Sequence, residues 1–64
     1  MDSSRSEYFY RGRKIIVEKD DRYRVFCYSP QNEIELRMEI ENTVLGKMLN
    51  EVKKRIDKFI TEKN

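Results

Sequence analysis

Aromatic and basic residues lie close together in one stretch near the start of this 64-residue chain. The segment YFYRGRK, residues 8–14, places three aromatics, three cations and one glycine in seven positions. Proteins that hold single-stranded nucleic acid use cations to contact phosphates and aromatic rings to stack on bases. The residue types in this stretch therefore predict a nucleic-acid contact.

Further arginines in the first half of the chain extend this candidate site. The predicted nucleic-acid-binding residues are Tyr8, Tyr10, Arg11, Arg13, Lys14, Arg22 and Arg24. The alternative interpretation is structural. Tyrosine and phenylalanine favour strands, a glycine bends a strand, and arginines keep an edge strand soluble.

The chain is poor in groups that catalyse reactions or bind metals. It has no histidine, which is the commonest general base near neutral pH. Its single cysteine, Cys27, can form no disulfide within one chain and cannot build a zinc site alone. Cys27 lies in the middle of an alternating segment, so we expect it in the core. We predict no catalytic residue, no metal, no cofactor and no enzymatic activity.

Charge divides the chain into three parts. Residues 1–25 carry seven cations and five anions, and residues 42–64 carry six cations and three anions. Residues 26–41 carry one cation and four anions, so the middle is acidic. The net charge of +2 is a weak indication of nucleic-acid binding, for which a strongly basic domain is typical.

These residues must be positioned by a small α+β domain. Residues 7–19 are rich in strand formers and read as one strand bent at Gly12, with a short separate hairpin as the alternative. Alternation predicts further strands over 22–28 and 33–41, and helical periodicity predicts a helix over 43–62. In the strand over 33–41, the apolar face should hold Ile34, Leu36, Met38 and Ile40, and the solvated face should hold Glu33, Glu35, Arg37, Glu39 and Glu41. Asn42 and Thr43 are candidates for the N-cap of the helix. The expected fold is β-β-β-α, a three-stranded antiparallel meander with one C-terminal helix across one face. Residues 1–6 are expected to be a flexible polar tail.

The helix carries one continuous apolar stripe. Its members are Leu45, Met48, Leu49, Val52, Ile56, Phe59 and Ile60. A helix of this length is roughly 28 Å long, whereas three strands make a sheet roughly 15 Å wide. The last turn should then overhang the sheet, so we expect a homodimer with Ile56, Phe59 and Ile60 at the interface. The alternative is that the first strand covers these residues.

The chain contains no apolar run near the roughly 18 residues that a membrane span requires. Its polar start does not resemble a signal peptide, and one unpaired cysteine fits a reducing compartment. We therefore expect a cytoplasmic protein with no membrane partner.

The segment GRKIIVEKDDRYRVFCYSPQNEIELRMEI, followed by a helix, resembles the arm-type DNA-binding domain of phage and transposon integrases. That family reads DNA with a three-stranded sheet, and the resemblance implies contacts at Arg13, Lys14, Arg22 and Arg24. The same layout is similar to the β-β-β-α core of HicB-type antitoxins, which bind a toxin.

Two functions follow as expectations. The first is a small non-catalytic module that binds DNA or RNA through its basic, aromatic first half. The second is a protein-binding regulator or inhibitor of the kind that phages and mobile elements encode. Its contacts would lie on the exposed sheet face, with Phe26 and Tyr28, or on the acidic third strand.

Overall fold

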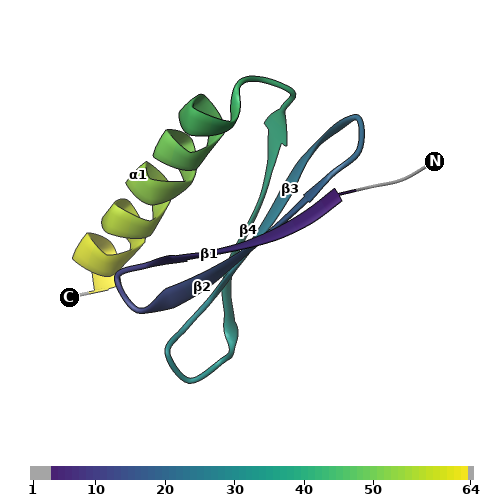
Figure 1. Ribbon diagram of the computed structural model, residues 1–64. Coiled ribbons are helices and arrows are strands. Elements are labelled where there is room, and N and C mark those ends of the chain that lie inside the picture. The colour runs from purple at the N-terminus through teal and green to yellow at the C-terminus, as the bar shows by residue number, and fades with distance from the viewer. Residues whose placement is uncertain (1–3, 64) are drawn as a thin grey trace.

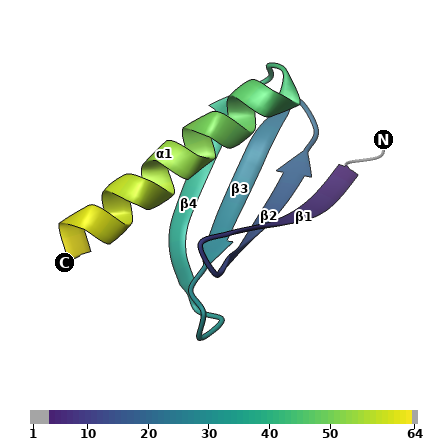
Figure 2. The same cartoon turned by 60° about the vertical axis from the view of Figure 1, so that its left-hand side comes forward.

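Four strands and one helix make up the chain (Figure 1), and the computed structural model describes residues 4–63. The strands form one antiparallel sheet in the order β1-β2-β3-β4, and α1 crosses one face of it obliquely (Figures 1 and 2). Their bounds are β1 Ser4–Tyr10, β2 Arg13–Lys19, β3 Arg22–Tyr28, β4 Ile34–Glu41 and α1 Leu45–Lys63. The prediction of an antiparallel sheet with one C-terminal helix is confirmed.

The prediction of three strands is wrong, because residues 7–19 fold back on themselves instead of bending once. Arg11 and Gly12 both have positive φ, at 52° and 78°, as the two central residues of a type I′ turn require. This turn matches the twist of the strands it joins, so β1 and β2 form a tight hairpin with Tyr10 opposite Arg13. β1 begins at Ser4, so residues 4–6 belong to the sheet. Residues 1–3 lie outside the described part of the chain.

The core lies between α1 and one side of the sheet, which we call the helix face. Tyr23, Val25 and Cys27 point into it, as the alternation along β3 predicted. The other fully or nearly fully buried members are Ile15, Val17, Met48, Val52 and Ile56. Each fully buried aliphatic side chain of this kind contributes about 1.5–3 kcal/mol relative to an exposed one. The opposite side of the sheet, the outer face, is covered by no other element within residues 4–63.

A bulge in β4 changes the predicted alternation of this strand. Cys27 pairs with Leu36 and Tyr28 pairs with Ile34, so Glu35 is one extra residue inserted into β4 at this shift of register. Ile34 is consequently turned to the outer face with Tyr28 and is 45% exposed. The prediction that Ile34 shares a face with Leu36 is therefore wrong, whereas Leu36 itself packs against the core.

The helix begins two residues later than predicted. The carbonyl oxygen of Val44 accepts hydrogen bonds from the backbone N–H groups of Lys47 and Met48, both at 3.1 Å. Thr43 was expected as a cap, but its carbonyl oxygen instead accepts a hydrogen bond from the Tyr23 hydroxyl at 2.9 Å. The start of the helix is thus tied to β3.

The C-terminal half of α1 lies against the β1–β2 hairpin. Ile56 is completely buried within the chain, so it has no surface to offer to a second chain. Ile60 packs against the core and Phe59 is half-buried. Tyr8 and Tyr10 of β1 pack against the same core cluster, so the added strand supplies much of the cover that a partner was expected to provide.

Alanine substitution should have opposite effects at the two glycines of the chain. Gly12→Ala should lower the free energy of unfolding by about 1 kcal/mol, because a side chain disfavours positive φ. Gly46→Ala should raise it by about 0.5–1 kcal/mol, because Gly46 is helical and an added Cβ meets no atom within 4 Å. Urea denaturation followed by circular dichroism measures both. Equal effects at the two sites would contradict the turn geometry.

Candidate functional site

The seven predicted nucleic-acid-binding residues do not form one surface. Strand register puts Tyr8, Tyr10 and Arg13 on the helix face. The other members are Lys14, Arg22 and Arg24 on the outer face and Arg11 in the hairpin turn. The interleaved stretch is therefore divided by the sheet, because neighbouring strand residues point to opposite sides.

Tyr10 and Arg11 join the hairpin to the helix through Asp57. The Tyr10 hydroxyl donates to the two Asp57 carboxylate oxygens at 3.0 and 3.1 Å, and Arg11 Nη1 lies 2.9 Å from Asp57 Oδ1. Lys53 Nζ lies 5.6 Å from the centre of the Tyr10 ring. These contacts occupy the Tyr10 ring and hydroxyl, which a stacked base would need.

The same contacts change the acidity of the groups involved. Hydrogen bonds from Arg11 and then Tyr10 hold the pKa of Asp57 below its ordinary value of 3.8. The bond to Asp57, followed by burial, raises the pKa of Tyr10 above 10.0. Because the pKa of Asp57 is lower in the folded chain, its stabilising effect is present above about pH 4. That effect is lost as the pH falls through the folded-state pKa.

Arg13 forms the most buried ion pair of the described residues. Its Nε lies 2.9 Å from Glu35 Oε1, and the two side chains are only 16% and 10% exposed. The bulge brings Glu35 to this position, since a regular strand would have turned it away from the helix face. Glu35 was predicted to belong to a solvated acidic face, and its burial beside Arg13 overturns that prediction.

The two outer-face arginines of the predicted site are also paired. Arg22 Nη1 lies 3.1 Å from Glu39 Oε1, and Arg24 Nη1 lies 2.6 Å from Asp20 Oδ2. Both pairs are about half exposed, so each contributes little to stability. Among the cations of residues 8–14 together with Arg22 and Arg24, Lys14 is the only one without an ion pair in the described chain.

The outer face divides into two zones. Towards the β2–β3 turn, one cross-strand row alternates in charge. This charged row is Arg5, Glu18, Arg24 and Glu39. Towards the β1–β2 turn, the residues that face outward are mostly apolar. This apolar zone is Phe9, Ile16, Phe26, Tyr28 and Ile34.

The side chains at the margins of the apolar zone are exposed to solvent, and the side chain at its centre is buried. Phe9 is 68% exposed and Ile34 is 45% exposed, whereas Ile16 is buried although no helix covers this side. Ile16 lies directly opposite Phe26 and is not part of the helix-face core. The zone is thus a small cluster with two large apolar side chains at its margins.

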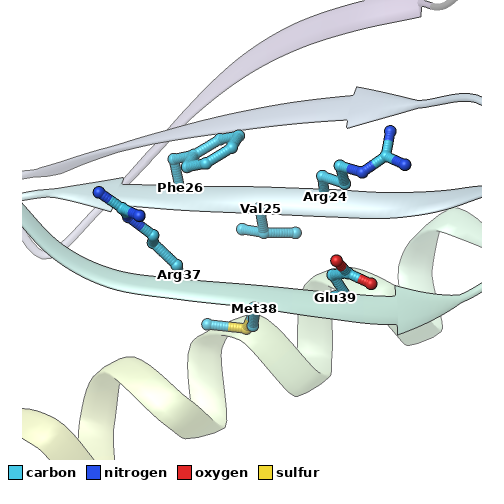
Figure 3. Close-up of a pocket in the computed structure, with 6 residues that line it drawn as sticks. All are labelled: Arg24, Val25, Phe26, Arg37, Met38 and Glu39. Atoms are coloured by element: carbon cyan, nitrogen blue, oxygen red, sulfur yellow. The ribbon is translucent and has the colours of Figure 1, made fainter.

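An open depression of about 320 Å³ lies beside the apolar zone, between β3 and β4. Figure 3 shows Phe26 and Arg37 on its outer side, with Val25 and Met38 pointing towards the helix. Glu39 and Arg24 border it towards the charged row. Arg37 is exposed and makes no ion pair among the described residues. The depression therefore offers an apolar wall next to an available guanidinium.

Part of this surface follows from the sequence pattern, and the rest depends on the hairpin and the bulge. The alternation along β3 placed Phe26 and Tyr28 outward, which the register confirms. Phe9 was missed because the hairpin was read as one bent strand. Ile34 was missed because the bulge reverses its direction. Arg-Gly between two runs of strand formers was the available hairpin signal, although asparagine or glycine is more usual than arginine at the first turn position.

Cys27 has the environment of a core residue. It is fully buried, and desolvation raises the pKa of its thiol to about 11. A reactive cysteine instead needs an accessible and electropositive position that stabilises the thiolate. Within residues 4–63, no three cysteine or carboxylate side chains gather in a way that could hold a metal ion.

No family model, curated protein or solved structure matches this chain. The two family resemblances rest on a three-stranded layout, from which the fourth strand departs. Among the described residues, the single helix is too polar to cross a membrane.

Replacing glutamate by glutamine should change the free energy of unfolding by very different amounts at two positions of β4. Glu35→Gln should lower the free energy of unfolding by about 3 kcal/mol, because it leaves the buried Arg13 charge without its partner. Glu39→Gln breaks the exposed pair with Arg22 and should change it by less than about 1 kcal/mol. Chemical denaturation of both variants tests the difference. Equal small effects would show that Arg13 and Glu35 are well hydrated.

The thiol of Cys27 should resist modification in the native chain. At pH 8 a pKa of about 11, against an ordinary value of 9.0, lowers the thiolate fraction roughly 100-fold, and burial slows the reaction further. A chromogenic disulfide reagent should react at once in denaturant and at least 100-fold more slowly in native buffer. Equal rates in the two conditions would contradict the burial of Cys27.

Proposed function

We propose that this chain is a small non-catalytic module that binds a protein partner through the outer face of its sheet and thereby regulates or inhibits it. The observation that carries the proposal is the apolar zone next to the depression at Phe26 and Arg37. This face is covered by no other element of the described chain, and it keeps two large apolar side chains, Phe9 and Ile34, exposed. Such clusters with a polar rim are typical of protein interfaces.

The charges around the apolar zone support a protein partner. The outer face carries cations and anions in alternation, and Arg22 and Arg24 are already neutralised by Glu39 and Asp20. Arg37 remains free to receive a carboxylate, in the two-pronged geometry that guanidinium favours. The expected partner surface therefore combines apolar side chains with an acidic residue opposite Arg37.

The same charges weigh against nucleic acid as the principal ligand. All four arginines of the predicted site, Arg11, Arg13, Arg22 and Arg24, lie within 3.1 Å of a carboxylate oxygen. A phosphate would have to displace these carboxylates and would still lie near the glutamates of the charged row. Nucleic-acid affinity depends on several unopposed cations acting together.

Capture with the immobilised chain tests the proposal. The wild type and a Lys47→Glu control on the exposed helix surface should retain the same protein from a lysate of the encoding cell. The outer-face variants Phe9→Ser and Arg37→Glu should fail to retain that protein. With that protein purified, each outer-face variant should bind at least tenfold more weakly in calorimetry, and Lys47→Glu within twofold. Equal affinities for all four chains would exclude the outer face.

Fluorescence anisotropy provides the counter-test. Labelled DNA and RNA, single-stranded and duplex, should show no binding at micromolar protein in about 50 mM salt. Binding that weakens steeply at about 200 mM salt, and that is lost in Arg22→Gln and Arg24→Gln, would favour the nucleic-acid function instead.

A further inference from the structure

β1 is an edge strand with one side of its backbone free. The two-residue turn makes Tyr10 and Arg13 a hydrogen-bonded pair, and such pairs alternate along an antiparallel ladder. Tyr8 and Ser6 therefore exchange bonds with β2. Arg5, Glu7 and Phe9 direct their backbone N–H and carbonyl groups away from the sheet. Edges of this kind can accept another strand.

The other edge of the sheet is protected against a second copy of itself. β4 is distorted by the bulge at Glu35, which disturbs regular pairing. It also carries glutamates at 35, 39 and 41, so most self-pairings would bring like charges together. β1 has an uninterrupted register from Ser4 to Tyr10 and carries one residue of each charge, Arg5 and Glu7.

We propose that a second copy of this chain pairs with β1 in antiparallel orientation, about a two-fold axis at Ser6. This register places Arg5 of each copy opposite Glu7 of the other, so the interface contains the same ion pair twice. Opposite-charge pairs directly across two strands are favourable. The neighbouring registers place Glu7 opposite Glu7 or Arg5 opposite Arg5, and like charges in these positions are unfavourable.

Side chains on the helix face also favour this register. A groove of about 200 Å³ lies beside β1, lined among others by Ser4, Ser6, Tyr8 and Leu45. Leu45 is 46% exposed there, and the small side chain of Ser4 leaves the groove open. In the proposed register Tyr8 of the second copy stands opposite Ser4, on the side of the groove. A large ring then lies next to a small side chain and covers apolar surface near Leu45.

The two-fold pairing also changes the surface available for function. It joins two sheets edge to edge, with both outer faces on the same side. Across the axis, the charged row of one copy, which ends at Arg5, meets the row of the other copy that runs from Glu7 to Ile16 and Phe26. The two apolar zones therefore lie diagonally across the axis on the same side of the joined sheet. A dimeric partner could contact both apolar zones at once.

Disulfide trapping with two serines of the same strand tests the register. Ser6→Cys places two thiols opposite each other across the axis, with Cα atoms about 4.5 Å apart, which a disulfide can span. Ser4→Cys is the matched control, because its two copies lie four residues apart along the strand, roughly 13 Å. Under mild oxidation most Ser6→Cys chains should form a dimer of twice 7.9 kDa, and Ser4→Cys chains should stay monomeric. Equal cross-linking of both, or of neither, would overturn the register.

Charge reversal tests the same pairing without a covalent bond. Arg5→Glu and Glu7→Arg should each weaken self-association at least tenfold in sedimentation equilibrium, because each brings like charges together. An equimolar mixture of the two variants should restore it, since every cross-chain pair is again of opposite sign. A mixture that stays monomeric while the wild type is dimeric would exclude this interface. Phe9→Ser should leave the Ser6→Cys cross-link intact, which separates this proposal from the outer-face function.

Discussion

The left-handed turn at Arg11 and Gly12 is the constraint on which the rest of the structure depends. By reversing the chain after Tyr10, it converts a basic aromatic stretch into two paired strands. It directs Tyr10 and Arg11 towards Asp57 at the far end of the helix. The turn therefore connects the first and last elements of a chain that has no disulfide to do so. It also decides that Phe9 points outward while its neighbours Tyr8 and Tyr10 point inward.

A single helix can cover only one side of a sheet. The helix face holds most of the buried aliphatic residues together with Cys27, and the described residues form no second helix that could cover the outer face. The outer face nevertheless holds an apolar zone large enough to bury Ile16. Charged side chains occupy the other half of that face. This uneven division of the face is the physical reason for proposing that binding uses the apolar half.

Part of this arrangement follows directly from sequence patterns. The alternation in β3 and the helical stripe from Leu45 to Ile60 predicted the sheet, the helix and the buried position of Cys27. The fourth strand could not be predicted with the same ease, because Arg11 is an unusual residue in a type I′ turn. The bulge at Glu35 leaves no trace in the alternation of β4, and the ion pair that accompanies it is formed with Arg13, twenty-two positions away. Local patterns do not contain such long-range partners.

The candidate site was harder to predict than the fold for a related reason. Composition counts the cations of the first half, but it does not show that their carboxylate partners come from the turn, the fourth strand and the helix. Once these partners are in place, Arg11 joins the hairpin to the helix, Arg13 pairs with the bulge residue Glu35, and Arg22 and Arg24 are paired on the outer face. The features of the sheet that the internal pairs do not use include Lys14, Arg37, the apolar zone and the backbone edge of β1. The first three lie on the outer face and the last lies at the edge, so the proposed edge-paired dimer and the proposed outer-face complex use different surfaces of one sheet.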